Sequence, residues 1–234
     1  MGERINISEI FYSIQGEGVY QGVPTTFIRF LGCNLLEPGC TWCDTRYARS
    51  DLSNLMDVDE ILDKCVSLEG RTYKHWVCIT GGEPLFQPAG LHELVKRLNK
   101  YGFLIEVETN GSLPKPLWWT LVDSWVADIK CPSSGVGRIS LENEWFDTRA
   151  CDQVKFVVGN KEDIDFARKV VMRNAARNPV VLVSPMIPNL NSADLDYWSG
   201  GSKMIEAVEL CKELKVRFSL QTHKIVYGSE RRGV

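Results

Sequence analysis

The sequence predicts an α/β protein in which a parallel sheet carries helices on its outside. Three observations lead to this fold class: short apolar runs typical of buried strands, amphipathic segments between most of them, and polar residues where the runs end. No repeat, low-complexity tract or linker divides the 234 residues, so we expect a single domain over residues 1–234.

Seven runs rich in β-branched and aromatic residues are predicted to be strands. Strands that are buried on both faces of a parallel sheet are apolar throughout, as these runs are. They cover residues 25–32, 75–82, 103–111, 124–130, 153–160, 180–186 and 217–224.

Four segments have apolar residues at helical spacing, namely 57–68, 91–102, 163–175 and 202–214. Asp57 is expected to cap the first and Gly102 to end the second. Strands that alternate with helices of this length form βα units. About six such units fit an incomplete barrel of the (β/α)6 type better than a complete eightfold barrel.

Polar residues follow five of the predicted strands. In barrels and open α/β sheets the ligand site lies at the carboxyl ends of the strands, so these side chains are expected to converge on one large site. They are Gly81, Gly82, Glu83, Glu108, Thr109, Asn110, Asp128, Lys130, Ser184, Gln221 and His223.

Charge and hydropathy exclude some classes of partner. The net charge is −3 and the basic residues are dispersed, so we expect no nucleic-acid partner. The first residues lack the apolar region of a secretory signal, and no apolar run approaches the roughly 20 residues of a membrane span. A cytoplasmic protein without a membrane partner is expected.

Three of the eight cysteines, Cys33, Cys40 and Cys43, lie within eleven residues. In a reducing compartment, clustered thiols are metal ligands rather than disulfide partners. The other five stand singly among apolar neighbours and are expected to be buried: Cys65, Cys78, Cys131, Cys151 and Cys211.

The number of ligands distinguishes the candidate metal centres. A structural zinc site needs a fourth ligand, for which only a remote residue such as His223 is available. A thioredoxin-like redox pair would leave Cys33 without a role. Three cysteines on a 4Fe-4S cluster leave one iron open to another ligand.

The three cysteines, Trp42 before the third of them and the downstream "TGGEP" at residues 80–84 resemble the radical SAM superfamily. The resemblance implies a radical SAM barrel, a 4Fe-4S cluster, S-adenosylmethionine and an electron donor such as flavodoxin or ferredoxin. Glycines without Cβ allow a close approach to the methionine amino group. The residues expected to contact S-adenosylmethionine are Trp42, Asp44, Gly82, Glu83, Glu108, Asn110, Pro132, Ser133 and Ser134.

Further motifs resemble the 7-carboxy-7-deazaguanine synthase family: "SIQGEG", "CDT", "ETNGS", "DIKCPSSG", "QVKFVVGN" and "QTHK". The resemblance implies a homodimeric lyase that converts 6-carboxy-5,6,7,8-tetrahydropterin to 7-carboxy-7-deazaguanine, with loss of ammonia, in queuosine-type biosynthesis. It also implies a magnesium ion held by the hydroxyl of Thr45. A neutral hydroxyl suits an ion that keeps several other oxygen ligands.

The same resemblance assigns the pterin site. The motif Ile14, Gln15, Gly16 and Glu17 is expected to read the pterin, with an amide and a carboxylate facing its donors and acceptors. Arg29 would pair with the substrate carboxylate. Thr80 would face the substrate, and His223 would bond to it or relay a proton, with a core histidine as the alternative.

Six residues separate Cys33 from Cys40, where the common spacing of the superfamily has three. The synthase family tolerates variation there. "SIQGEG" also occurs in activating enzymes that install glycyl radicals on a partner protein, which is the alternative within the superfamily. "CDT" together with "QTHK" favours the synthase, and a zinc-stabilised binding module is the alternative of another class.

Overall fold

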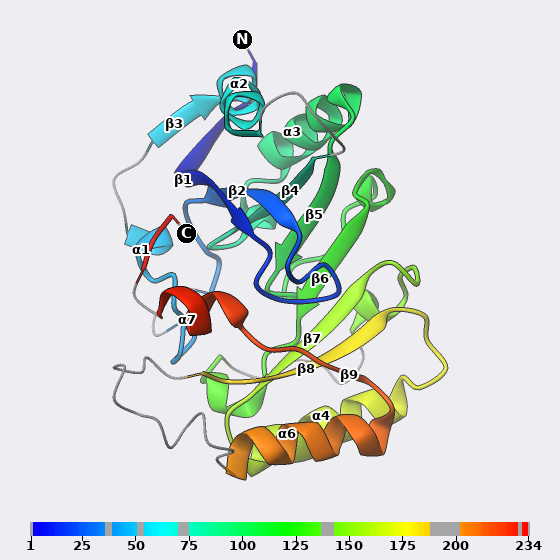
Figure 1. The fold of residues 1–234 in the computed structure, drawn as a ribbon. Helices are drawn as coiled ribbons and strands as arrows, with labels where there is room; N and C mark the ends of the chain where they lie inside the picture. Colours follow the sequence, from blue (N-terminus) through cyan, green and yellow to red (C-terminus); the bar gives the residue numbers. More distant parts are fainter. Residues whose placement is uncertain are drawn as a thin grey trace.

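The computed structural model describes residues 2–35, 39–50, 54–69, 75–136, 143–187, 202–228 and 231–233. Its strands form one curved sheet in the order β3-β1-β2-β4-β5-β6-β7-β8-β9 (Figure 1). They are β1 (Arg4–Ile14), β2 (Pro24–Phe30), β3 (Asn54–Asp57), β4 (Trp76–Gly81), β5 (Leu104–Thr109), β6 (Ser124–Asp128), β7 (Gln153–Val158), β8 (Val180–Pro185) and β9 (Arg217–Phe218).

The strands from β2 to β9, apart from β3, are parallel, and each of the seven predicted runs contains one of them. This confirms the predicted α/β class and the incomplete barrel. The sheet is not wholly parallel, however, because β1 pairs antiparallel with both β2 and β3. The last predicted run is also shorter than expected, since the strand ends at Phe218 and a helix follows.

Strand β1 was not predicted, because its burial is partial and its apolar residues are mixed with polar ones. Ile5 and Ile7 face the core, whereas the second half of the strand is only half-buried. Its pairing with β2 extends to Ile14, opposite Pro24. The antiparallel pairing brings the segment after Ile14 to the middle of the sheet, beside β4 and β5.

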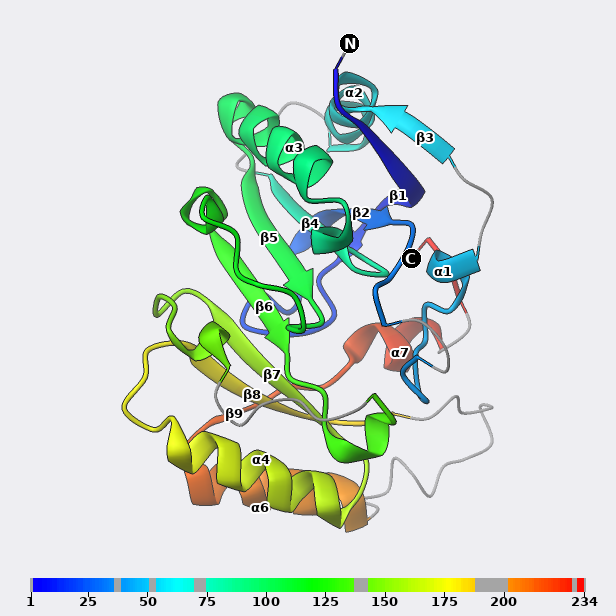
Figure 2. The same ribbon diagram turned by 180° about the vertical axis from the view of Figure 1, so that it is seen from behind.

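The helices are α1 (Tyr47–Ser50), α2 (Val58–Glu69), α3 (Pro88–Tyr101), α4 (Lys161–Arg173), α6 (Ser202–Leu214) and α7 (Thr222–Tyr227). Helix α2 covers the sheet near β1 and α3 covers it near β5, while α4 and α6 cover it near β7 and β8 (Figures 1 and 2). Gly102 ends α3 in the left-handed conformation, as predicted. At the start of α2, the Glu60 carboxylate accepts a hydrogen bond from the Asp57 N–H.

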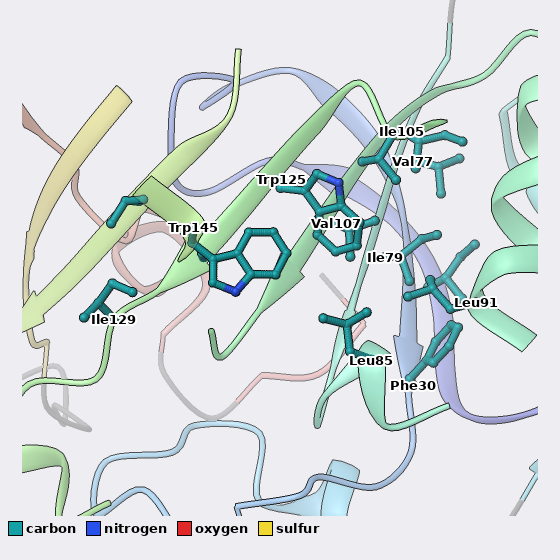
Figure 3. Packing of buried hydrophobic residues seen from close by; sticks show 14 of the residues in the cluster. Phe30, Val77, Ile79, Leu85, Leu91, Ile105, Val107, Trp125, Ile129 and Trp145 are labelled. Carbon is teal, nitrogen blue, oxygen red and sulfur yellow. The ribbon is translucent and has the colours of Figure 1, made fainter. Parts of the chain in front are cut away.

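The core lies between the sheet and these helices. Trp125 of β6 and Trp145 are both about 1% exposed or less, and their ring centroids are 5.1 Å apart (Figure 3). Ile79 of β4 and Leu91 of α3 are fully buried in the same cluster. Each such side chain stabilises the fold by about 1.5–3 kcal/mol. This packing gives the carboxyl ends of the strands a rigid base.

Four of the five isolated cysteines are buried as predicted, but Cys151 is exposed. No helix in the described parts of the chain is long and apolar enough to cross a membrane.

Candidate active site

A cavity of about 230 Å³ lies at the carboxyl ends of the strands, where the polar residues were predicted to converge. Helices α1 and α7 lie beside the same edge (Figures 1 and 2). The predicted site residues that line it are Ile14, Gln15, Gly16, Glu17, Arg29, Cys33, Cys40, Trp42, Cys43, Asp44, Thr45, Thr80, Gly82, Glu108, Asn110 and His223. Four predicted residues do not line it: Glu83, Pro132, Ser133 and Ser134.

The three clustered cysteines share this cavity. A 4Fe-4S cluster bound by these three cysteines would take one thiolate at each of three irons and leave the fourth iron open to another ligand. Residues 36–38 of the gap after Cys33 lie outside the described part of the chain.

Burial raises the pKa of the Cys33 and Cys40 thiols above the ordinary range of cysteine. Thiolates at these positions therefore need a positive counter-charge, which the irons of a cluster supply. Asn110 helps to hold this loop, because its side-chain amide donates to Asn34 at 2.9 Å and approaches the Cys33 sulfur at 3.8 Å.

Gly82 packs closely against the backbone of Gly32 in the cysteine loop. A Cβ on Gly82 would lie 2.0 Å from the carbonyl oxygen of Gly32, next to Cys33. The N–H of Gly82 donates to the Phe30 carbonyl at 3.0 Å, and that of Glu83 donates to Gly32 at 2.8 Å. The close approach therefore packs the end of β4 against the cysteine loop, in addition to exposing Gly82 to the cavity.

Glu83 does not line the cavity, and its contact with S-adenosylmethionine stays a prediction. Its side chain is fully buried and accepts bonds from the N–H groups of Leu85 (2.9 Å) and Asn110 (2.7 Å) and from the Thr109 hydroxyl (2.9 Å). These bonds use three of the roughly four acceptor directions of the carboxylate. Glu83 fixes the turn after β4 and the end of β5.

Residues Pro132–Ser134 form a 3-10 turn after β6 that supports the cysteine loop from outside the cavity. The carbonyl of Ser134 accepts from the Thr41 N–H, and that of Ser133 accepts from the Thr41 hydroxyl, both at 2.9 Å. The Ser133 hydroxyl bonds to Asp163 of α4. The turn therefore positions the loop through its backbone, and its hydroxyls do not point at the cavity as predicted.

Glu17 lies in the cavity wall with two partners from distant elements. Its carboxylate lies 2.7 Å from Nζ of Lys155 in β7 and accepts from the Gln221 amide at 3.0 Å. Burial acts to raise the pKa of Glu17, but the charges of Lys155 and His223 and the hydrogen bonds from Lys155 and Gln221 together hold the pKa far below its usual range. Burial acts to lower the pKa of Lys155, but the charges of Glu17, Asp128 and Glu108 together raise it overall. Both groups are charged.

Gly16 and His223 are in direct contact. A Cβ on Gly16 would lie 2.3 Å from Nδ1 of His223. The Gly16 carbonyl accepts from both the N–H (3.0 Å) and the hydroxyl (2.9 Å) of Thr222. His223 thus lies on the short helix α7 rather than at a strand end, and Gly16 allows that helix to pack directly against the segment after β1.

Arg29 is in β2, inside the sheet rather than at its edge. Its Nε lies 2.7 Å from a carboxylate oxygen of Glu9, and its guanidinium carbon lies 5.8 Å from the Phe11 ring and 5.9 Å from that of Tyr47. The bond to Glu9 uses Nε, so the terminal nitrogens of the guanidinium are directed to other neighbours. A carboxylate in the cavity would be one such neighbour.

Thr80 and Glu108 face the cavity from neighbouring strands, and the Thr80 hydroxyl donates to Glu108 at 2.8 Å. Asp44 pairs with Lys224 of α7 at 2.9 Å. Burial acts to raise the pKa of Asp44, but the charge of Lys224 lowers it overall. The ion pair connects α7 to the cysteine loop beside Thr45, whose hydroxyl lies 3.7 Å from the Cys43 sulfur.

Five charged residues of the cavity were not assigned a ligand from the sequence: Arg49, Asp128, Lys130, Lys155 and Lys224. Lys130 pairs with Oδ2 of Asp128 at 2.7 Å, while Oδ1 of Asp128 is buried without a hydrogen-bond partner. Asp128 and Lys130 end a predicted strand and were expected at the site for that reason, although no ligand was assigned to them. Lys155 lies inside a strand pattern, and only the fold shows that it faces the cavity.

The comparisons with known proteins agree with this geometry. Residues 27–197 match the family model described as "Radical SAM superfamily". The chain is 37% identical to the 7-carboxy-7-deazaguanine synthase of Methanospirillum hungatei, over 95% of this chain and 85% of that protein. It is 34% identical to the synthase of Koribacter versatilis, over 98% and 100% of the two chains. The crystal structure of QueE from Escherichia coli has a similar fold, with a TM-score of 0.67, 23% identity and 93% of each chain covered.

The fold, the three-cysteine cavity and the family match define an enzyme of the radical SAM superfamily. Such enzymes bind a 4Fe-4S cluster and S-adenosylmethionine. Within the superfamily, the chain belongs to the 7-carboxy-7-deazaguanine synthase family. This membership favours the synthase over the glycyl-radical activating enzyme and argues against the zinc-stabilised binding module.

Proposed function

We propose that this enzyme converts 6-carboxy-5,6,7,8-tetrahydropterin to 7-carboxy-7-deazaguanine with loss of ammonia. One observation carries the proposal: the "SIQGEG" motif and the three cysteines, from opposite sides, line one cavity. A reactive group formed at the cluster would therefore meet a substrate held by Glu17 without leaving the cavity. The names of the relatives support the same product.

The residues of the cavity fit the methionine part of S-adenosylmethionine. An ammonium group would give a partner to the buried oxygen of Asp128, and a carboxylate would find the cation of Lys130. Trp42 offers an aromatic face for the adenine. A 4Fe-4S cluster held by Cys33, Cys40 and Cys43, with S-adenosylmethionine beside it, would supply the one-electron reduction and the hydrogen-atom abstraction that the reaction needs.

Glu17 is suited to hold the pyrimidinone edge of the pterin. A carboxylate has about four lone-pair directions, and Lys155 and Gln221 occupy two of them. The remaining directions can accept from the amino and ring N–H groups of the substrate. Because Lys155 keeps Glu17 ionised, the Glu17 carboxylate accepts hydrogen bonds throughout the neutral pH range. Arg29 and a magnesium ion on Thr45 would hold the substrate carboxylate.

The magnesium ion, the homodimer and the electron donor are parts of this proposal. The Thr45 hydroxyl lines the cavity and is a hard oxygen ligand beside the expected position of the substrate carboxylate. The described cysteines are all free thiols, which supports a reducing compartment such as the cytoplasm. The single continuous sheet supports one domain.

The test is anaerobic reconstitution of the protein with iron and sulfide, followed by addition of S-adenosylmethionine, reductant, magnesium and the carboxytetrahydropterin. We expect 7-carboxy-7-deazaguanine and ammonia in equal amounts. Cleavage of S-adenosylmethionine without that product would overturn the substrate assignment and leave the superfamily intact.

A further inference from the structure

Below the cavity, Glu106 of β5 accepts hydrogen bonds from two glutamine side chains. Its side chain is buried, with 2% of the residue exposed. One carboxylate oxygen accepts from Nε2 of Gln15 at 2.5 Å, and the other accepts from Nε2 of Gln153 in β7 at 3.0 Å. The carboxylate therefore lies between the end of β1 and the start of β7.

The side-chain carbonyl groups of Gln15 and Gln153 both accept hydrogen bonds from the loop 15–19. The side-chain carbonyl of Gln15 accepts from the Glu17 N–H at 3.3 Å, and that of Gln153 accepts from the Val19 N–H at 2.9 Å. Each amide thus connects Glu106 to a backbone N–H of the loop 15–19. If either amide turned over, its NH2 group would face an N–H and its carbonyl would face a carboxylate.

The loop leaves little room for an alternative arrangement. A Cβ on Gly18 would lie 2.6 Å from the side-chain carbonyl oxygen of Gln153, and the φ of Gly18 is +75°. The Gly18 N–H also donates to Ser219 at 3.0 Å. The loop rests directly on the Gln153 amide, so a change in that amide displaces the segment that carries Glu17.

Cys78, Glu106 and Glu108 lie within 4.8 Å of one another, which could suit a metal ion. The Gln15 Nε2 group, however, lies 2.5 Å from Glu106, 3.4 Å from Glu108 and 3.6 Å from the Cys78 sulfur. A hydrogen-bond donor already occupies the centre of this group. These contacts form a hydrogen-bond network that orients the Gln15 amide, and they leave no place for a cation.

We propose that Glu106 is a positioning residue: through Gln15 and Gln153 it fixes the backbone of the loop 15–19 and so presents Glu17 to the substrate. The role of the loop in substrate binding rests on the proposed function. The role of Glu106 in ordering the loop rests only on the contacts above. Two measurements therefore distinguish the ordering of the loop by Glu106 from the role of the loop in substrate binding.

The test compares Glu106→Gln with the swapped double variant Glu106→Gln/Gln153→Glu. The single variant places an NH2 group against one of the two glutamine NH2 groups. In the double variant, Gln at 106 accepts from Gln15 and donates to Glu at 153, and the Val19 N–H keeps an acceptor. Glu93→Gln, on the exposed side of α3, is the matched control for loss of a carboxylate.

In the first measurement, hydrogen exchange of the loop 15–19 is followed in the reconstituted enzyme without substrate. We expect exchange at Val19 to rise about tenfold or more in Glu106→Gln, as loss of a buried bond predicts, and to return toward wild type in the swap. In the second, the KM for the carboxytetrahydropterin should rise about tenfold in the single variant with a smaller change in kcat, and recover in the swap.

The proposal would be overturned if hydrogen exchange and KM were unchanged in Glu106→Gln. It would also be overturned if Glu106→Gln/Gln153→Glu were as impaired as the single variant. If the single variant does not fold, the swap decides: wild-type exchange supports the positioning role, and failure of both to fold shows a role in stability alone. If wild-type enzyme makes no carboxydeazaguanine, the proposed function fails, while the exchange measurement still decides on Glu106.

Discussion

The carboxylate of Glu17 lies 2.7 Å from Nζ of Lys155, although 138 residues separate them in the sequence. The pair joins the loop after β1 to the middle of the sheet and places one fixed anionic group in the cavity wall. It also makes the charge state of Glu17 independent of pH over a wide range.

We therefore expect Lys155→Met to destabilise the protein by about 3–5 kcal/mol, because it leaves a buried carboxylate without its counter-charge. The KM for the substrate should rise in the same variant. Denaturant unfolding of the reconstituted enzyme measures the loss of stability, and Glu17→Gln/Lys155→Met is the control, with a smaller loss. Equal losses in the single and double variants would contradict the pairing.

The directions of the two pKa shifts determine how the contribution of the Glu17–Lys155 pair to stability depends on pH. The lowered pKa of Glu17 gives a contribution that is present above its ordinary value of 4.5, and the raised pKa of Lys155 gives one that is present below its ordinary value of 10.5. The pair should therefore stabilise the fold by a constant amount between these two values. A stability difference between wild type and Glu17→Gln/Lys155→Met, in which neither position ionises, that varies strongly within this window would contradict it.

Gly16→Ala should impair both folding and substrate binding, since its Cβ would lie 2.3 Å from His223. Overpacking of this kind costs about 1–3 kcal/mol. Thermal unfolding and the substrate KM measure the two effects, and Gly2→Ala, where a Cβ meets nothing within 4 Å, is the control. Adding His223→Ala should restore stability but not turnover, and failure to restore stability would show that the clash lies elsewhere.

Replacement of Cys33, Cys40 or Cys43 by alanine should abolish cluster binding, because each is predicted to supply one of three irons with its protein ligand. Iron and sulfide content after anaerobic reconstitution measures this directly. Cys151→Ala changes an exposed and isolated thiol and should leave the cluster intact. A full complement of iron in any of the three cluster variants would remove that cysteine from the ligand set.

Thr45→Ala should remove the stimulation of turnover by magnesium, whereas Thr45→Ser should keep it, because serine retains the hydroxyl ligand. Turnover is measured in a magnesium titration at fixed S-adenosylmethionine and substrate. The same magnesium response in Thr45→Ala and wild type would show that the ion, if it binds, uses another ligand.

Glu106 should make the fold less stable as the pH rises. Burial and then the charge of Glu108 raise the pKa of Glu106 to about 8, against the opposing hydrogen bonds from Gln15 and Gln153 and the charge of Lys155. Between 4.5 and about 8 the folded state therefore binds more protons than the unfolded state, and stability falls with pH across this window. The nearby Cys78 thiol stays neutral, since burial raises its pKa well above the ordinary value.

Denaturant unfolding of the reconstituted enzyme from pH 5 to 9, at about one-unit intervals, measures this slope. Glu106→Gln cannot ionise at this position, so its stability should lose the fall that wild type shows over the same window. Parallel pH profiles of the two proteins would contradict the raised pKa.

Much of the fold could be predicted from the sequence. Apolar runs that alternate with amphipathic helices are local patterns, and each of the seven runs contains a parallel strand of the sheet. The antiparallel strand β1 was missed, because half-buried residues such as Glu9 obscure its pattern. The helix α7 was taken for a strand end, because Thr222 and His223 directly follow the apolar pattern of β9.

The site was predicted in part. Cys33, Cys40 and Cys43 are close in the sequence, so their spacing alone indicates a shared metal centre. Glu83 was expected to face the cofactor, but its carboxylate caps the turn after β4, which depends on how β4 meets β5. A short motif identifies a functional region but not the direction of each side chain.

By itself the sequence determined the class of sheet and the family and predicted the cluster ligands, because these depend on residue type and on short separations along the chain. The tertiary structure alone decided which charges meet: Lys155 beside Glu17, and Glu106 between Gln15 and Gln153. The physical reason is that the strength of a buried ion pair or hydrogen bond depends on distance and burial, and for residues this far apart both are set by strand order and register.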